Sequence, residues 1–186
     1  MTQLLASGEN ASAFNMTFEF RDEADRSAFE KANDAFEWLE QSRRVDEREA
    51  LLVTTVFPAV LSDMLHCFYE ALEVSRKGKL AIAFMLVRKP LQESLFLLES
   101  VIADRSDFAK KLSTDPVKLW SQTAGGVEVH AKRIQKVLDV LKEGHRFDAE
   151  YLAQLRYDKK AQDGFDVFAT RPCICLRATK LFALSR

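Results

Sequence analysis

The most apolar segment of its length in the chain runs from Lys79 to Asp104, and charged residues interrupt it at few positions. From Leu80 to Val87 the sequence is apolar on every side of a helix, whereas a surface helix carries only an apolar stripe. A helix of this kind must be enclosed by others, so we expect it at the centre of a bundle. The stretch is too short and too interrupted by charge to predict a membrane span.

Pro90 is expected to shape this central helix. Inside a helix, a proline removes one backbone donor and clashes with the carbonyl four residues earlier, here that of Leu86. Pro90 could instead begin a new helix, but Lys89, which precedes it, is a poor capping residue. We therefore expect one long helix that is kinked between Leu86 and Pro90.

Helical periodicity continues before the central stretch. From Val53 to Leu72, apolar residues recur at the spacing of one helix face, and Pro58 marks either a start near Thr55 or a bend. Gly78 separates this helix from the central one. An earlier helix, capped by Asp22 or Asp25, is predicted from the apolar positions Phe29, Ala32, Phe36 and Leu39.

Shorter helices are expected after the central stretch. Asp104 to Lys111 is polar with one apolar anchor, Phe108. Helix starts are indicated at Asp115-Pro116 and Asp148, and a third helix has the apolar face Val127, Ile134, Leu138 and Leu141, with Gly144 as its C-cap. Pro172 prevents one regular helix from Val167 to Leu184.

These elements predict an all-α fold, a bundle of six to eight helices with a long, kinked central helix. A chain of 186 residues suits one domain, and six Gly and four Pro suit long helices with few turns. We expect residues 1–186 to form a single domain with a loose segment at 1–15. The side chains of Phe84, Leu95 and Leu98 are predicted to be inaccessible.

Charge is unevenly distributed, although the net charge is only −1. Residues 1–50 hold twelve acidic and six basic side chains, and the rest of the chain has a basic excess. The segment from Val167 to Arg186 has no acidic residue. We expect it either to dock on the acidic first helix, in the same copy or in a second one, or to remain a solvated basic tail. The acidic positions concerned are Glu30, Asp34, Glu37 and Glu40.

The cysteines do not describe a secreted disulfide framework, because there are three and two of them, Cys173 and Cys175, are only two positions apart. With Cys67, they are more typical of small buried hydrophobic residues. There is no signal-peptide pattern and no phosphate-binding or dinucleotide-binding motif. We therefore expect a cytoplasmic protein with no cofactor and no membrane partner.

One polar helix face could hold a metal ion. Asp63, His66, Glu70 and Glu73 occur at i, i+3, i+7 and i+10, so they line one side of the predicted helix from Val53 to Leu72. Helical bundles bind metals with such side chains, but they need ligands from other helices as well. A solvated acidic face and a metal-dependent hydrolase both remain open.

A second set of polar groups lies on the central helix. Arg88, Lys89, Glu93 and Glu99 interrupt its apolar surface, with Arg88 four residues before Gln92 and Lys89 four before Glu93. Buried charges are costly unless they are paired, so these groups should have partners. Two interpretations remain open, a structural salt bridge and a ligand-binding pocket.

The same region resembles a known superfamily. Residues 84–111 contain Arg-Lys-Pro-Leu-Gln-Glu-Ser-Leu, then Leu-Leu-Glu and Asp-Arg-Ser-Asp-Phe. They resemble bacterial helical proteins related to the HEPN superfamily. The resemblance implies a helical bundle that often dimerises and that acts in toxin–antitoxin or phage-defence systems, as an RNase or as an RNA- or nucleotide-binding module. Its RNases place an Arg four to six residues before a His, and none of His66, His130 or His145 has this spacing.

The sequence therefore favours a non-catalytic helical interaction module. We expect a homo-oligomer, specifically a dimer, with a protein or RNA partner. The alternative is a metal-dependent hydrolase that uses the Asp63, His66, Glu70 and Glu73 face.

Overall fold

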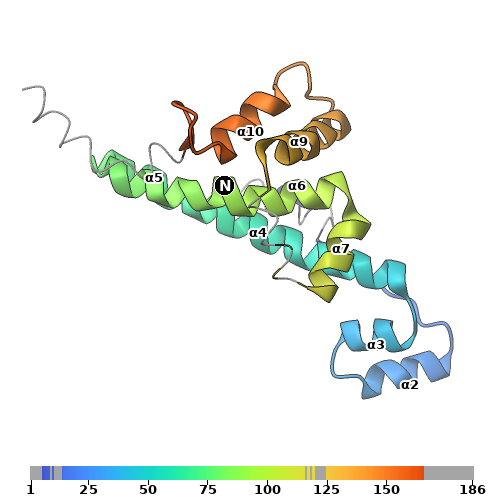
Figure 1. The fold of residues 1–186 in the computed structure, drawn as a ribbon. Coiled ribbons are helices and arrows are strands. Elements are labelled where there is room, and N and C mark those ends of the chain that lie inside the picture. Colours follow the sequence, from blue (N-terminus) through green and yellow to red (C-terminus); the bar gives the residue numbers. More distant parts are fainter. Residues whose placement is uncertain are drawn as a thin grey trace, which may run out of the picture.

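A computed structural model describes residues 6–8, 10, 14–115, 117, 119 and 125–165. Within these residues it contains eight α-helices, one π-helical turn and no strand, which confirms the predicted all-α class and the expected number of helices. In Figure 1, two long antiparallel helical rods form the body of the molecule, and shorter helices pack on them.

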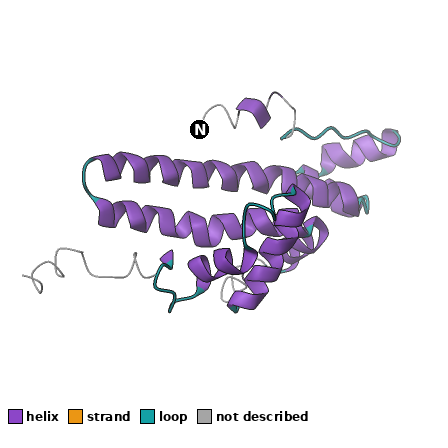
Figure 2. Cartoon of the chain, turned by 90° about the horizontal axis from the view of Figure 1, so that it is seen from above, coloured by secondary structure: helices purple, strands orange, loops and turns teal. Residues whose placement is uncertain are grey.

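The two rods are α4 (Val45–Arg76) and the stretch made of α5 (Leu80–Lys89), η1 (Pro90–Ser94) and α6 (Leu95–Ala103). They form a hairpin whose turn contains Gly78 with φ +73°, a left-handed conformation that glycine adopts without a steric penalty. In Figure 2, α4 and α5 run side by side and extend away from the cluster of shorter helices. Gly78 thus separates the two rods as predicted.

Pro90 is accommodated without breaking the second rod. The helix continues through it, as expected, but the irregularity lies after Pro90, where the backbone N–H of Leu95 donates to the carbonyl of Pro90 five residues earlier. A single wide turn of this kind is a common way to absorb a residue that does not fit the regular helix. Pro58 lies inside α4, which starts at Val45, so a start near Thr55 was wrong.

The N-terminal region forms two helices where one was expected. Asp22 caps α2 (Glu23–Lys31) by accepting from the backbone N–H of Asp25 at 2.7 Å. The backbone is extended at Ala32, and Asp34 caps α3 (Ala35–Gln41) by accepting from the N–H of Glu37 at 2.8 Å. The capping aspartate therefore interrupts the continuous apolar pattern, because its side chain replaces a helical hydrogen bond.

The remaining helices pack on the two rods. Asp104 caps α7 (Arg105–Thr114), a helix that the polar sequence there did not predict, and Phe108 on it is buried as an anchor. α9 (Val127–Leu141) and α10 (Ala149–Tyr157) form an antiparallel pair over α6, on the side opposite α4 (Figure 1). Asp148 caps α10 as predicted, but α9 ends at Lys142 with φ 58°, so Gly144 is not its C-cap.

The core is concentrated in α6 and leaves α5 exposed. Phe96, Leu97, Leu98 and Val101 on α6 are buried, and Phe96, Leu97 and Val101 belong to a core cluster with Phe57 and neighbouring residues of α4. On α5, in contrast, Phe84 is 40% and Met85 65% exposed. The prediction that Leu98 is inaccessible is confirmed, that for Phe84 was wrong, and Leu95 is half-buried. The expected enclosure of Leu80 to Val87 was also wrong, since α5 packs chiefly against α4.

By length and composition, α4 is apolar enough to cross a membrane, and it is the one helix of the described part of the chain that meets this criterion. The criterion alone is weak evidence, since core helices of soluble proteins also meet it. The predictions for Cys173, Cys175 and the segment from Val167 to Arg186 lie outside the described residues, as do most of those for residues 1–15 and for the helix after Asp115.

Candidate functional site

A cluster of charged side chains is buried where α6, α9 and α10 meet. We call it the Glu99 cluster; it consists of Glu99, Arg133, Arg156 and Tyr157. Arg156 Nη1 forms an ion pair with Glu99 Oε1, and Arg133 Nη2 lies 3.3 Å from Glu99 Oε2. The side chains of Glu99 and Arg156 are 9% and 4% exposed, so both carboxylate oxygens are paired away from bulk water.

The cluster is tied to the π-helical turn. Because the N–H of Leu95 bonds to Pro90, it does not bond to the carbonyl of Leu91, which instead accepts from Arg156 Nε at 2.8 Å. The side chain of Gln92 returns a bond to the carbonyl of Arg156 at 2.9 Å. The hydroxyl of Tyr157 donates to the carbonyl of Gln92 at 3.2 Å and accepts from Arg156 Nη2 at 2.7 Å. The turn that Pro90 creates is therefore where α10 docks.

Aromatic rings close the cluster. The imidazole of His130 is fully buried and stacks on the ring of Tyr157, with centroids 3.6 Å apart and planes 12° from parallel. The guanidinium of Arg133 lies 4.2 Å from the centroid of the Phe96 ring. Burial lowers the pKa of Arg133, opposed by the charge of Glu99, and burial raises the pKa of the Tyr157 hydroxyl, opposed by the charge of Arg156. Tyr157 is thus neutral at pH 7.

This arrangement favours a structural role over a ligand-binding one. Both oxygens of Glu99 are engaged by arginines of the same chain, which is the salt-bridge interpretation predicted for this residue. Of the other candidates on the central helix, Arg88 Nε donates to Gln92 Oε1 at 3.2 Å, Glu93 is half-buried and Lys89 is exposed. Through Gln92 and Arg156, Arg88 is therefore joined to the same network as Glu99, whereas Lys89 is exposed.

The polar face of α4 is also dispersed. Asp63 and His66 are exposed, Glu70 is half-buried, and Glu73 forms an exposed ion pair with Arg76 at 3.1 Å. Nowhere among the described residues do three His, Cys, Asp or Glu side chains lie close enough to hold a metal ion together. Ligands from a second helix, which such a site needs, are not near this face in the described structure.

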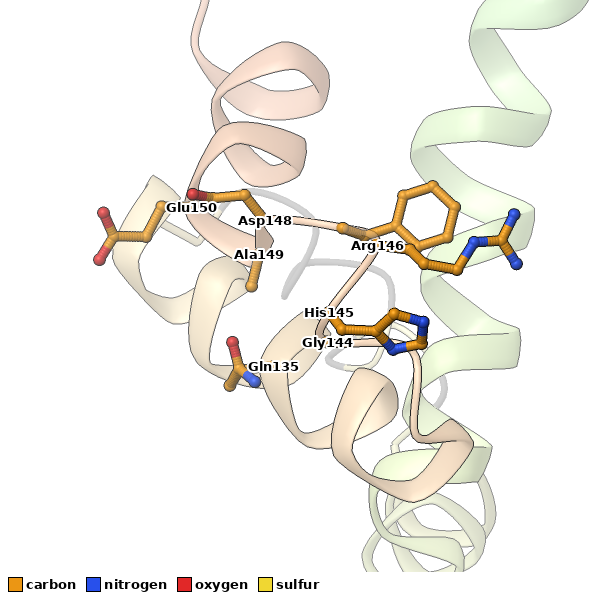
Figure 3. A pocket seen from close by; sticks show the side chains of 8 residues that line it. Gln135, Gly144, His145, Arg146, Asp148, Ala149 and Glu150 are labelled. Carbon is orange, nitrogen blue, oxygen red and sulfur yellow. The ribbon is translucent and has the colours of Figure 1, made fainter.

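One surface hollow lies at the loop between α9 and α10 and has a volume of about 510 Å³. Figure 3 shows that its charged side chains do not converge, since Glu150 and Arg146 extend to opposite sides. Asp148 is occupied in capping α10, and Gln135 donates to Asp139 at 2.8 Å. The hollow offers no group of side chains aimed at one point, so it does not define a chemical site.

A second buried carboxylate lies near the N-terminus, in a place that the sequence did not indicate. Asp25 accepts from the backbone N–H of Arg21 at 3.0 Å, from Trp38 Nε1 at 2.9 Å and from the hydroxyl of Ser42 at 3.2 Å. Arg44 Nη1 lies 3.6 Å from it. The bond from Arg21, ahead of those from Trp38 and Ser42 and the charge of Arg44, holds the pKa of Asp25 below its ordinary value against the opposing effect of burial.

Trp38 is the centre of this second cluster, which we call the Asp25 cluster. Its side chain is fully buried, and the rings of Phe18, Phe20 and Phe29 surround it at centroid distances of 5.2–5.7 Å. Arg44 lies 4.8 Å from the indole centroid. The signal that could have predicted this is the density of aromatic residues between Phe18 and Trp38.

The free end of the hairpin carries a set of exposed apolar side chains. Its exposed side chains, which we call the tip surface, are Tyr69, Leu72, Leu80, Ile82 and Met85, each 47–65% exposed. From Val74 to Gln92 the sequence has five basic residues and no acidic one. Exposed large apolar side chains gathered at one end of a molecule are typical of interaction sites.

Comparisons with known proteins give no family assignment. No protein-family model, no curated protein and no solved structure matches the chain.

Proposed function

We propose that the chain is a non-catalytic helical interaction module and that the tip surface is where it binds its partner. The observation that carries this proposal is the contrast between the two polar regions and the tip. The Glu99 and Asp25 clusters satisfy their charges within the chain, whereas Leu80, Ile82 and Met85 expose apolar side chains on a helix that packs chiefly against one neighbour.

A protein surface is the partner that this chemistry favours. The five exposed apolar side chains would each gain from removal of water, by roughly 25 cal/mol per Å² of apolar area. RNA is a second candidate, supported by the five basic residues between Val74 and Gln92 and by the resemblance to the HEPN superfamily, whose members act in bacterial defence or toxin–antitoxin systems. The cytoplasm is the compartment that fits either partner.

Site-specific photo-crosslinking in cells of the source organism tests the proposal. A benzoylphenylalanine residue at Met85, which is 65% exposed, should form crosslinked products with a macromolecular partner. The matched control is Val140 on α9, which is 61% exposed and lies outside the tip surface. Equal products from both positions, or none from Met85, would contradict the proposal.

A further inference from the structure

The two ends of α4 differ in charge in a way that suits a second copy of the same chain. Residues 19–40, around α2 and α3, hold eight acidic and three basic side chains. The opposite end, from Val74 to Gln92, holds five basic side chains and no acidic one. α4 has 32 residues and so is about 48 Å long, which keeps the two charged regions of one copy apart.

Both ends also expose large apolar side chains. The tip surface does so at the basic end, and Phe20 and Phe29 are 44% and 39% exposed at the acidic end. In Figure 1, α2 and α3 project from the end of α4 on the side opposite α9 and α10. The two ends of the hairpin therefore carry regions of opposite charge, each with exposed apolar side chains.

A line of exposed residues on α4 joins the two ends. Thr55, Ala59, Ser62, His66 and Tyr69 are all exposed and recur at spacings of four and three, the repeat with which helices pack lengthwise. Ala59 and Ser62 are small, so two α4 helices could approach closely there. Ser62 is fifteen residues from Lys77 and seventeen from Val45, so it lies near the midpoint between the basic tip and the start of α4.

From this geometry we infer that the partner of the tip surface is a second copy, held antiparallel about a two-fold axis near Ser62 of α4. This inference rests on the proposed function, because it names the partner of the same surface. An isologous arrangement makes each contact twice. Each basic tip lies against the acidic α2–α3 region of the other copy, so opposite charges meet at both ends and set the direction of pairing.

Charge reversal at each end provides the test, measured as the dimer dissociation constant by analytical ultracentrifugation at low salt. Glu30 and Glu40 are suitable because their side chains are 65% and 69% exposed and neither caps a helix. The tip variant is Lys77→Glu with Lys79→Glu, and the acidic-end variant is Glu30→Lys with Glu40→Lys. Each should raise the dissociation constant by at least about tenfold, because every like-charge contact occurs twice.

The variant that carries all four substitutions should recover most of the wild-type affinity, since its ends are again complementary. The control is Lys132→Glu with Lys136→Glu on exposed positions of α9, which should leave the dissociation constant within about twofold. Melting temperatures of dilute samples check that the variants fold.

Three outcomes would overturn the inference: a wild-type chain that stays monomeric at all concentrations, a fourfold variant that dimerises no better than the tip variant, or binding of the tip to anionic lipid vesicles without self-association. Crosslinks from Met85 separate this failure from failure of the proposed function. Crosslinks from Met85 to another molecule would contradict only the antiparallel dimer. The absence of crosslinks would contradict both the dimer and the proposed function. Crosslinks to peptides of α2 or α3 in a second copy support the inference.

Discussion

The chain buries two carboxylates between arginine and aromatic side chains, and it stabilises them in different ways. Glu99 is held by two arginines from α9 and α10, more than thirty residues away along the chain. Asp25 is held mainly by neutral donors from within seventeen residues, namely the N–H of Arg21, the indole of Trp38 and the hydroxyl of Ser42. The first cluster fastens separate helices together, and the second organises one local segment.

This difference determines how much stability the protein would lose when a member of each cluster is substituted. Removing a charge that is paired with charges on other helices leaves those partners buried and unpaired. The free-energy cost of this exceeds the stability that the pair itself contributes. A carboxylate with several neutral donors can lose one and keep the others. We therefore expect the Glu99 cluster to be the more sensitive of the two.

Glu99→Ala should have the largest effect. It leaves Arg133 and Arg156 buried without their shared carboxylate, and it should lower the free energy of unfolding by about 3–5 kcal/mol, as removal of one partner of a buried pair does. Urea unfolding followed by circular dichroism measures this loss. Glu128→Ala, at an exposed position of α9, is the control and should change it by less than about 0.5 kcal/mol. A loss below about 1 kcal/mol for Glu99→Ala would mean that the cluster is not a structural anchor.

Tyr157→Phe should cost about 1–2 kcal/mol at neutral pH, because the hydroxyl bridges the carbonyl of Gln92 and the guanidinium of Arg156. The substitution also changes how the free energy of unfolding depends on pH in alkaline solution. The folded-state pKa of Tyr157 is raised, so the contribution of the neutral hydroxyl is fully present below the unfolded pKa of about 10 and is lost as the pH rises through the folded pKa. Unfolding measured at pH 8 and above pH 10 should show a smaller alkaline loss in the variant. An equal alkaline loss of unfolding free energy in the wild type and the variant would contradict this role of the Tyr157 hydroxyl.

Trp38→Phe should have a smaller effect, about 1 kcal/mol, if the Asp25 cluster relies on several donors. The ring contacts with Phe18 and Phe29 are largely kept, whereas the indole N–H that donates to the side chain and to the backbone carbonyl of Asp25 is lost together with part of the buried ring. Hydrogen exchange of α2 and α3 is the appropriate measurement, because these helices pack mainly on each other and on α4. Faster exchange throughout α6 would show instead that the N-terminal cluster supports the whole bundle.

The smallest expected effect is on stability at acidic pH, and it tests the contribution of the Asp25 carboxylate separately. Its folded-state pKa is lowered, so its contribution is present above the unfolded pKa of about 4 and is lost as the pH falls through the folded value. The wild type should therefore lose stability more steeply than Asp25→Asn between about pH 4 and pH 2. Melting temperatures across this range provide the comparison, and parallel curves would show that the charge of Asp25 contributes nothing.

The sequence predicted one of these clusters in part. Glu99 was expected to need a partner because it interrupts an apolar helix, but nothing local identified Arg133 and Arg156, which are 34 and 57 residues away. Asp25 was expected at most to cap a helix. Asp22 caps α2 instead, and the side chain of Asp25 accepts from Trp38 Nε1. This contact depends on where the chain reverses between α2 and α3.

By itself, the sequence determined the all-α class, the cap Asp148, the break at Gly78 and the buried position of Leu98, and it limited the first cap to Asp22 or Asp25. These follow from side-chain spacing and backbone preference, which act over a few residues. Only the tertiary structure decided that α6 is buried while α5, which is also largely apolar, is exposed. The physical reason is that burial depends on which other helices reach a surface. α9 and α10 cover the rod as far as the π-helical turn at Pro90, where Arg156 and Tyr157 attach them, and α5 lies beyond it.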